Sequence, residues 1–321
     1  MSQAIAHELL GASEIAAALG LSQWRSPLEV WLEKTGQAPA FEGNRCTAWG
    51  TDLEPALRTW YAREYQVAIW IPPESLTSAE HPFLRATPDG LVLADDQLAP
   101  DDPSNWSQGF EAKSVGWRMA HEWGEPGSDE VPTPFLLQAQ QNMLVAGVDA
   151  WHLVASIGGA PPVVYAIERD DELIAMIIDG GRRFMACVAN RVPPAIDGSE
   201  AWSRYIAERH PWSTEEYVRA RPEDEVLVSR WREVAAQLAE LERVEAELKN
   251  QIAAAIGEAS GMVSSLGRIS YRPRRGGPNH AAAFAALADE VGIAEERRAE
   301  LLAQHQRRDS RPVMAPRSWS R

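Results

Sequence analysis

The chain has 321 residues, of which 45% are hydrophobic, and a formal net charge of -15 at pH 7. This length and composition suit one large domain or a domain with an accessory region. No apolar run approaches the roughly 18 residues of a membrane span, and the start, "MSQAIAHELLGASE", lacks a signal peptide's basic and apolar segments. We therefore expect a globular protein of the cytosol.

The cysteine count and the charge exclude further classes. Cys46 and Cys187 are too few for a four-cysteine zinc or iron-sulfur site, and we interpret them as small buried apolar residues in a reducing compartment. The acidic balance argues against indiscriminate binding to nucleic acid or anionic membranes, but not against a DNA enzyme with a basic channel. Of 31 basic residues, only Lys34, Lys113 and Lys249 are lysine, so each lysine raises the question of what its chemistry serves.

The first predicted elements are helices. "SEIAAALG" reads as a short helix with Ser13 as N-cap and Gly20 as its stop. "SPLEVWLEKTG" has Ser26 as N-cap and Glu29 as the capping-box partner. "WGTDLEPALRTWYAREY" carries apolar residues on one face, which is typical of a helix packed on a core.

Strands and two more helices complete the predicted core. Alternation and turn residues predict strands at 67–71, 86–93, 109–115, 150–157 and 162–168, and a polar loop joins the second to the third. Helices are expected from Thr133 to Gly147 and from Asp170 or Asp171 to the prolines at 193 and 194. The order predicts an α/β core over residues 1–197 with a sheet flanked by helices.

The remainder differs in pattern. After a tryptophan-rich connector at 198–222, apolar residues recur at heptad spacing, interrupted by Glu245: Trp231, Val234, Leu238, Leu241, Leu248 and Ile252. This predicts a helical hairpin or short coiled coil in an accessory region at 223–321. Residues 268–321 hold eleven arginines against six acids, so the predicted tail is basic.

The residues with the clearest chemistry lie in "ATPDGLVL" and "GFEAKSV". Residues two apart on a strand point to the same side, so Glu111 and Lys113 share a face, and hairpin pairing brings Asp89 beside Glu111. Two carboxylates with waters suit Mg²⁺, and a lysine can position or help deprotonate an attacking water. By spacing alone, a turn followed by an exposed ion pair worth under about 1 kcal/mol is the simpler interpretation.

An ordered series of six segments favours the metal-site interpretation over the exposed ion pair. "GASEIAAALGLSQWRSPLEVWLEKTG", "WGTDLEPAL", "ATPDGLV", "FEAKS", "QAQQNMLVAG" and "YAIERDDELI" resemble, in this order, the YqaJ-type viral recombinase nucleases. These are the lambda exonuclease-like branch of the PD-(D/E)xK nucleases. The resemblance covers about residues 8–192, and its specificity lies in the ordered series. It implies the restriction-endonuclease-like core, a central mixed sheet flanked by helices.

The resemblance also implies residue roles. Asp89, Glu111 and Glu54 would bind the metal ions, and Lys113 would assist the attacking water. From the residues alone, Glu54 equally suits a capping box with Thr51 as N-cap, or an ion pair with the arginine four residues on.

Three polar residues match other family positions. Gln138 and Gln140 match a Gln-x-Gln helix at the family's active site, although they also fit plain polar positions on a helix. Ser13 matches a serine that contacts the substrate 5'-phosphate, and an N-cap role is compatible with that contact. The arginine that often precedes this serine is missing, since "AIAHELLGAS" offers only His7.

The function implied is a deoxyribonuclease that uses Mg²⁺, with Mn²⁺ as a substitute, and degrades double-stranded DNA from 5' to 3' by two-metal hydrolysis. Its setting would be phage or prophage recombination in a bacterial cytoplasm, as a ring-shaped trimer beside a single-strand annealing recombinase. The alternatives are a single-strand, flap or endonuclease of the same superfamily, or a non-catalytic scaffold that binds DNA ends. Trp24, Trp49 and Trp117 are candidates for stacking on a frayed base, although tryptophans are more often core residues.

Overall fold

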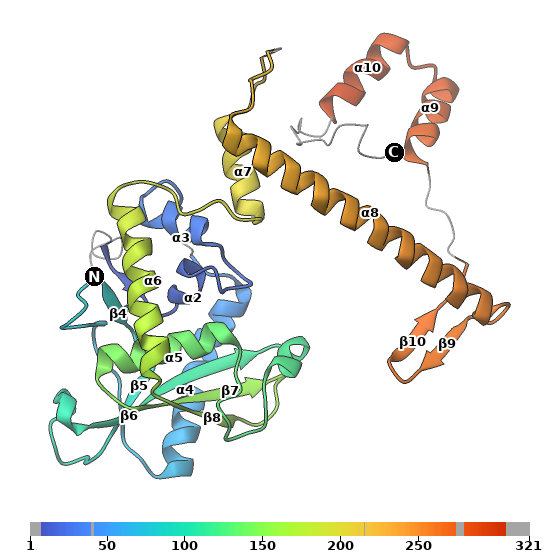
Figure 1. The fold of residues 1–321 in the computed structure, drawn as a ribbon. Coiled ribbons are helices and arrows are strands. Elements are labelled where there is room, and N and C mark those ends of the chain that lie inside the picture. The colour runs from blue at the N-terminus through green and yellow to red at the C-terminus, as the bar shows by residue number, and fades with distance from the viewer. Residues whose placement is uncertain (1–7, 40–41, 215, 274–278, 306–321) are drawn as a thin grey trace. The chain divides into compact units, whose positions relative to one another are not determined.

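The computed structural model describes residues 8–39, 42–214, 216–273 and 279–305, in two compact units, Met1–Ile206 and Ala207–Arg321 (Figure 1). Each unit is treated by itself below. Within the described residues, no helix combines the length and the apolar character needed to cross a membrane.

The first unit is built on a five-stranded mixed sheet in the order β2-β5-β6-β7-β8. Its strands are β2 (Ile69–Trp70), β5 (Gly90–Leu93), β6 (Trp106–Val115), β7 (Ala150–Ile157) and β8 (Val163–Glu168). β6 and β7 run parallel, and the other neighbours run antiparallel. The predicted α/β class is confirmed, and the strand with Glu111 and Lys113 is the central one.

A smaller sheet breaks one predicted strand in two. It has the order β1-β4-β3, with β1 (Leu10–Gly11), β4 (Leu84–Ala86) and β3 (Leu76–Thr77). The strand predicted over 86–93 ends at Ala86 in this sheet and restarts at Gly90 in the central sheet. Pro88 between them has no N–H to give to a ladder, which favours the break. Asp89 therefore lies at the point where the chain passes between the sheets.

Helices cover both faces of the central sheet (Figure 1). The helices that pack directly on the sheet are α4 (Arg45–Tyr65) and α5 (Thr133–Ala146). The other helices up to residue 209 are α2 (Ile15–Ala18), α3 (Pro27–Lys34), α6 (Asp171–Ala189) and α7 (Glu200–Arg209), with short 3-10 turns η1 (Pro103–Asn105) and η2 (Trp117–Glu122). α4 packs Leu57 and Tyr61 on one face, beside Phe110. α5 packs Ala139 and Met143 on the other face. Because side chains alternate along β6, Glu111 and Lys113 point toward α5.

Some helix ends agree with the predictions and others do not. Ser26 and Glu29 form the expected capping box of α3, and Gly147 ends α5 with a positive φ of 74°. α2 starts after Glu14 and has no side-chain cap, so the N-cap role predicted for Ser13 is wrong. α4 begins at Arg45, capped by Asn44, which leaves Thr51 in the helix interior. The capping-box alternative for Glu54 is therefore wrong as well.

Gly109 and the two cysteines differ in how closely the fold packs around them. Gly109 of β6 faces Trp151 of β7, and a Cβ on Gly109 would lie 2.0 Å from the Trp151 ring. Only glycine at this position leaves room for the ring of this fully buried tryptophan against β6. Both cysteines were predicted to be buried, but Cys187 is only half-buried and Cys46 is exposed in the first turn of α4. The predicted burial of Cys46 is therefore wrong.

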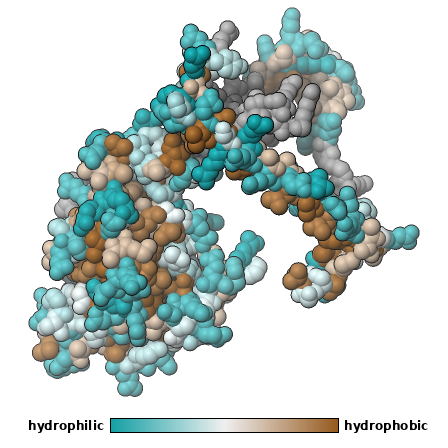
Figure 2. Space-filling view, in the orientation of Figure 1, coloured by the Kyte–Doolittle hydropathy of each residue, from teal (hydrophilic) through white to brown (hydrophobic). Residues whose placement is uncertain are grey.

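The second unit contains the heptad pattern. α8 (Pro222–Ile256) is one continuous helix, followed by a β-hairpin of β9 (Gly261–Ser264) and β10 (Gly267–Ser270) and by α9 (His280–Val291) and α10 (Glu295–Gln304). A β-hairpin rather than a returning helix thus follows α8. Apolar side chains recur along α8 in Figure 2, and Leu238 and Leu241 are exposed. Much of the predicted basic tail, residues 274–278 and 306–321, lies outside the described residues.

Candidate active site

Asp89 and Glu111 lie side by side at the junction of β5 and β6. The antiparallel register pairs Gly90 with Phe110, so the next pair outward is Asp89 and Glu111. Oδ2 of Asp89 accepts a hydrogen bond from the backbone N–H of Ala112 at 2.8 Å. This bond fixes the Asp89 carboxylate against the strand that carries Glu111.

Glu111 is buried and held by three side chains. It is 4% exposed, and its Oε1 accepts hydrogen bonds from Lys113 Nζ at 2.7 Å and Gln138 Nε2 at 2.6 Å. Its Oε2 accepts from Asn142 Nδ2 at 3.3 Å. A buried carboxylate is tolerated when it is paired and hydrogen-bonded in this way.

Lys113 is fixed between the sheet and α5. Its Nζ also donates to Gln138 Oε1 at 3.0 Å and lies 4.9 Å from the centre of the Phe135 ring. Only 14% of the side chain is exposed, so the exposed surface pair considered from the sequence does not describe it. The ammonium is oriented by a carboxylate, an amide and an aromatic face, and its remaining N–H is available to a ligand.

Both carboxyl groups have a raised pKa. Burial, and then the charge of Asp89, raise the pKa of Glu111 from 4.5 to about 7, against the opposing effect of Lys113. Burial also raises the pKa of Asp89, although Lys113 and the Ala112 hydrogen bond lower it. Strongly shifted groups of this kind are typical of functional sites. Negative charge is held here at a cost that a bound cation would offset.

Glu54 lies near this pair but is held by α4 itself. Its Oε1 forms an ion pair with Arg58 one helical turn on, as one of the sequence alternatives had it. Arg58 Nε also donates to the backbone oxygen of Asp89 at 2.9 Å. Burial, and then the charge of Asp89, raise the pKa of the Glu54 carboxyl. Glu54 is therefore electrostatically coupled to the site, with an arginine as its present partner.

Gln140 is placed elsewhere. Its Nε2 donates to the backbone oxygen of Glu168 at 2.7 Å, and its Oε1 accepts from the backbone N–H of Asp170 at 2.9 Å. Both ends of the amide thus join α5 to the β8–α6 connection. Residues two apart on a helix are turned by about 200°, so Gln138 and Gln140 cannot both face Glu111.

Asn142 belongs to the site although the sequence did not single it out. It stands four residues after Gln138, on the same face of α5, and is 1% exposed. Its Oδ1 is buried without a hydrogen-bond partner, while its Nδ2 donates to Glu111. The i, i+4 relation to Gln138 is the signal that could have identified it.

Ser13 is exposed in the turn before α2 and takes no part in the hydrogen bonds described above. Beside it, Glu14 accepts from the Gly11 backbone N–H at 2.7 Å and pairs with buried Lys34 at 2.8 Å. Lys34 also donates to the Leu9 backbone oxygen. This lysine, notable by its rarity in the chain, therefore serves an internal ion pair.

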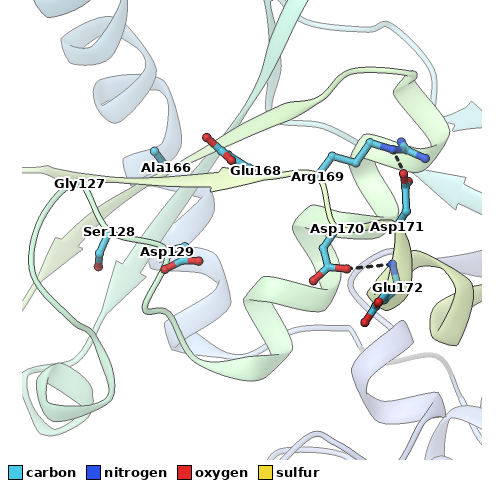
Figure 3. Close-up of a pocket in the computed structure, with 9 residues that line it drawn as sticks. All are labelled: Gly127, Ser128, Asp129, Ala166, Glu168, Arg169, Asp170, Asp171 and Glu172. Atoms are coloured by element: carbon cyan, nitrogen blue, oxygen red, sulfur yellow. Dashed lines mark hydrogen bonds and ion pairs between the residues drawn. The ribbon is translucent and has the colours of Figure 1, made fainter.

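A pocket of about 760 Å³ lies between the loop at 127–129 and the start of α6 (Figure 3). Five acidic residues and one arginine line it with Gly127, Ser128 and Ala166: Asp129, Glu168, Asp170, Asp171, Glu172 and Arg169. None of the predicted site residues is among them. Asp170 caps α6 through the N–H groups of Glu172 and Leu173, so part of this acidity has a structural role.

The fit of a metal rests on two carboxylates. Across the described ranges, no group of three or more His, Cys, Asp or Glu side chains is arranged to hold a metal ion. Mg²⁺, however, commonly uses one or two carboxylates and keeps several waters. Oδ2 of Asp89 accepts the hydrogen bond from the Ala112 amide, so Oδ1 is the oxygen that could bind a cation beside Glu111. The donor set therefore fits a divalent cation through Asp89 and Glu111, while Glu54 would first have to leave Arg58.

The chain is similar to one curated protein and to several solved structures. The curated Bacillus subtilis (strain 168) protein named "Uncharacterized protein YqaJ" is 27% identical over 252 residues, 76% of this chain and 73% of that protein. An alkaline exonuclease structure from Laribacter hongkongensis is 22% identical, covering 64% of this chain and 98% of that one, with a TM-score of 0.46. A phage-related exonuclease structure from Haemophilus somnus 129PT is 14% identical, covering 59% and 98%, with a TM-score of 0.42.

A family model fits the segment that holds the site. Residues 3–149 match the model of the YqaJ-like viral recombinase domain, and this range includes every residue predicted for the site as well as Asn142. The match contains five of the six quoted segments, and the sixth, "YAIERDDELI", follows it in the chain. The resemblance found in the sequence is confirmed over residues 3–149, which are similar to the YqaJ-like viral recombinase domain.

Proposed function

We propose that the chain is a Mg²⁺-dependent deoxyribonuclease, with Mn²⁺ as a substitute, that degrades double-stranded DNA from its 5' ends. The observation that carries the proposal is the buried Glu111 carboxylate, gripped by Lys113 and Gln138 beside Asp89. An ion pair that served only the protein surface would not require a buried Glu111 carboxylate. The family and the order of its motifs support the choice of phosphodiester hydrolysis in recombination.

A divalent cation at Asp89 and Glu111 would supply charge neutralisation for the scissile phosphate and a lower pKa for a water. The chain's own residues supply the positioning. Gln138 holds both Glu111 and Lys113, so the ammonium stays within 2.7 Å of the carboxylate. The remaining Lys113 N–H donates to the attacking water or a phosphate oxygen, and Phe135 shields that hydrogen bond from solvent.

The proposal places the nuclease core at residues 1–197, a connector at 198–222 and an accessory region at 223–321. It sets the protein in a bacterial cytoplasm, as a homotrimer around DNA, beside a single-strand annealing recombinase. A mass near three times 35.4 kDa by light scattering is the expected result, and an active species of 35.4 kDa contradicts the trimer. Co-purification with a recombinase from the same phage or prophage tests the partner.

The test of function is digestion of end-labelled DNA by purified protein with Mg²⁺. A 5'-labelled duplex should release its label early as a nucleotide, a 3'-labelled duplex should keep its label until late, and closed circles should remain intact. Manganese should support cleavage, and a chelator should stop it. Rapid cutting of circles instead favours the endonuclease alternative, and preference for single strands favours the flap-type alternative.

The scaffold alternative is tested by the site itself. Glu111→Gln should abolish cleavage while DNA-end binding persists, because the change removes one carboxylate charge and little volume. Gln140→Ala is the matched control on α5, since Gln140 contacts only backbone groups of the β8–α6 connection. DNA-end binding by wild-type protein without cleavage under Mg²⁺ or Mn²⁺ supports the scaffold and contradicts the nuclease.

A further inference from the structure

Trp24 is a half-exposed aromatic side chain that contacts the ring of Phe135. It lies in the segment between α2 and α3, and its ring contacts that of Phe135 at a centroid distance of 5.4 Å with a 31° tilt. Half of the Trp24 surface, 50%, remains exposed. The prediction that tryptophans here are core residues does not hold for it, and the exposed half of its side chain is accessible to a ligand.

Trp24 is close to the proposed catalytic lysine. The Phe135 ring that contacts Trp24 also lies 4.9 Å from Lys113 Nζ. The ammonium is therefore within about 10 Å of the Trp24 ring, which equals about three nucleotide steps at roughly 3.4 Å per step along one strand. A base on Trp24 would belong to a nucleotide near the scissile phosphate.

The aromatic contact is anchored in the core. Phe135 packs on Trp123 at 5.6 Å, and Trp123 packs on Tyr165 of β8 at 4.9 Å. The neighbouring Gln23 donates to Glu122 of η2 at 3.2 Å, which joins the Trp24 segment to the structure that follows β6. A ring held in this way loses little conformational freedom when a ligand stacks on it.

We propose that Trp24, backed by Phe135, is a stacking site for an unpaired nucleobase next to the scissile phosphate. This inference rests on the proposed nuclease function and adds a substrate subsite to it. Stacking on an aromatic face suits any base because every base has a π-face. Such a site would hold a frayed terminal nucleotide open without selecting a sequence, as an enzyme that digests along DNA requires.

Trp49 and Trp117 provide contrast. They are 60% and 72% exposed, but within the described residues neither ring packs on another aromatic ring. Trp117 has the Arg118 guanidinium 5.5 Å from its ring. Trp49 lies on α4, where alanine is a good helix former, so Trp49→Ala is the matched control for removal of an exposed indole.

The experiment is a double-mutant cycle that combines removal of the tryptophan side chain with removal of a DNA base. Wild type, Trp24→Ala, Trp24→Phe and Trp49→Ala are assayed on 5'-phosphorylated duplexes that are intact or carry an abasic analogue at one of the first three nucleotides. On intact DNA, Trp24→Ala should raise KM by about 10- to 100-fold, and Trp24→Phe should recover most of the loss. At one of the abasic positions, the KM of the wild type should rise by a similar factor, whereas the KM of Trp24→Ala should rise little further.

The outcomes separate this inference from the proposed function. Equal effects of Trp24→Ala on intact DNA and on all abasic duplexes overturn the stacking site, even if cleavage is robust. Absence of cleavage by wild type overturns the nuclease, and the same cycle measured by fluorescence anisotropy of labelled duplexes then decides on stacking. Melting temperatures of the variants identify misfolding, and Trp24→Phe supplies the result if Trp24→Ala does not fold.

Discussion

Replacing Glu111 by glutamine should stabilise the protein at alkaline pH while it abolishes cleavage. The Glu111 carboxyl is buried, and its pKa is raised from 4.5 to about 7 by burial and by Asp89. A group with a raised folded pKa binds protons more tightly in the folded state. Its favourable contribution is present below pH 4.5 and is lost as the pH rises through about 7.

The magnitude follows from the shift. At about 1.4 kcal/mol per pKa unit, ionisation of Glu111 costs the metal-free folded state about 3 kcal/mol above pH 7 and under about 1 kcal/mol at pH 5. Glutamine avoids this cost, because its oxygen accepts from Lys113 and Gln138 as the carboxylate did. Its NH₂ group faces Asn142, whose Oδ1 has no partner and can accept after the amide turns over.

The assay is urea unfolding of both proteins between pH 5 and pH 8.5 in a chelator, followed by tryptophan fluorescence, which reports buried Trp31 and Trp151 of the first unit. The variant's advantage should grow with pH to about 3 kcal/mol. Added Mg²⁺ should then stabilise only the wild type, because a ligand stabilises the fold that binds it. A difference that stays constant over this pH range refutes the assignment of the raised pKa to Glu111.

Two further substitutions separate chemistry from scaffold. Lys113→Arg should lower kcat by about 10²- to 10⁴-fold in digestion assays with an unchanged circular dichroism spectrum, because a guanidinium keeps its proton and presents its N–H groups in a different geometry from an ammonium. A near-normal kcat contradicts a proton-transfer or water-orienting role. Gln140→Ala should lower the free energy of unfolding by about 1 to 3 kcal/mol, because the Asp170 N–H loses its acceptor. Its kcat should stay within about twofold of the wild-type value. A loss of kcat without a loss of stability would mean that Gln140 acts in the active site.

The pairing of Asp89 with Glu111 could be predicted because it depends on local geometry. Alternation along a strand fixes which side chains share a face, and an antiparallel hairpin fixes which residues lie opposite one another. The polar loop with four aspartates did not disturb this register, apart from an irregularity between Val92 and Leu93. The break of the strand at Pro88 was less visible, because the pattern of strand and turn residues does not show which of two sheets a strand joins.

The polar face of α5 could be predicted only in part. The segment "QAQQNM" has four amide side chains in five positions, so no hydrophobic period shows which of them faces the sheet. Tertiary packing selects Gln138 and Asn142 and turns Gln140 away. The helical turn of about 200° between Gln138 and Gln140 already excludes a shared role at one atom. Only the position of β6 shows which of the two is at the carboxylates.

Glu54 shows how an arginine can set the order of metal binding. Arg58 holds both the Glu54 carboxylate and the backbone oxygen of Asp89, so a cation at Asp89 and Glu111 has to displace a guanidinium to gain a third carboxylate. Mg²⁺ keeps its waters readily, which favours contact with Glu54 through a bound water. Glu54→Gln should therefore raise the Mg²⁺ concentration for half-maximal cleavage by about 10- to 100-fold, as loss of an outer contact does, while kcat at saturating Mg²⁺ largely recovers. Titration of cleavage rate against Mg²⁺ checks this, and a variant as inactive at saturation as Glu111→Gln would mean that Glu54 leaves Arg58 and binds the cation directly.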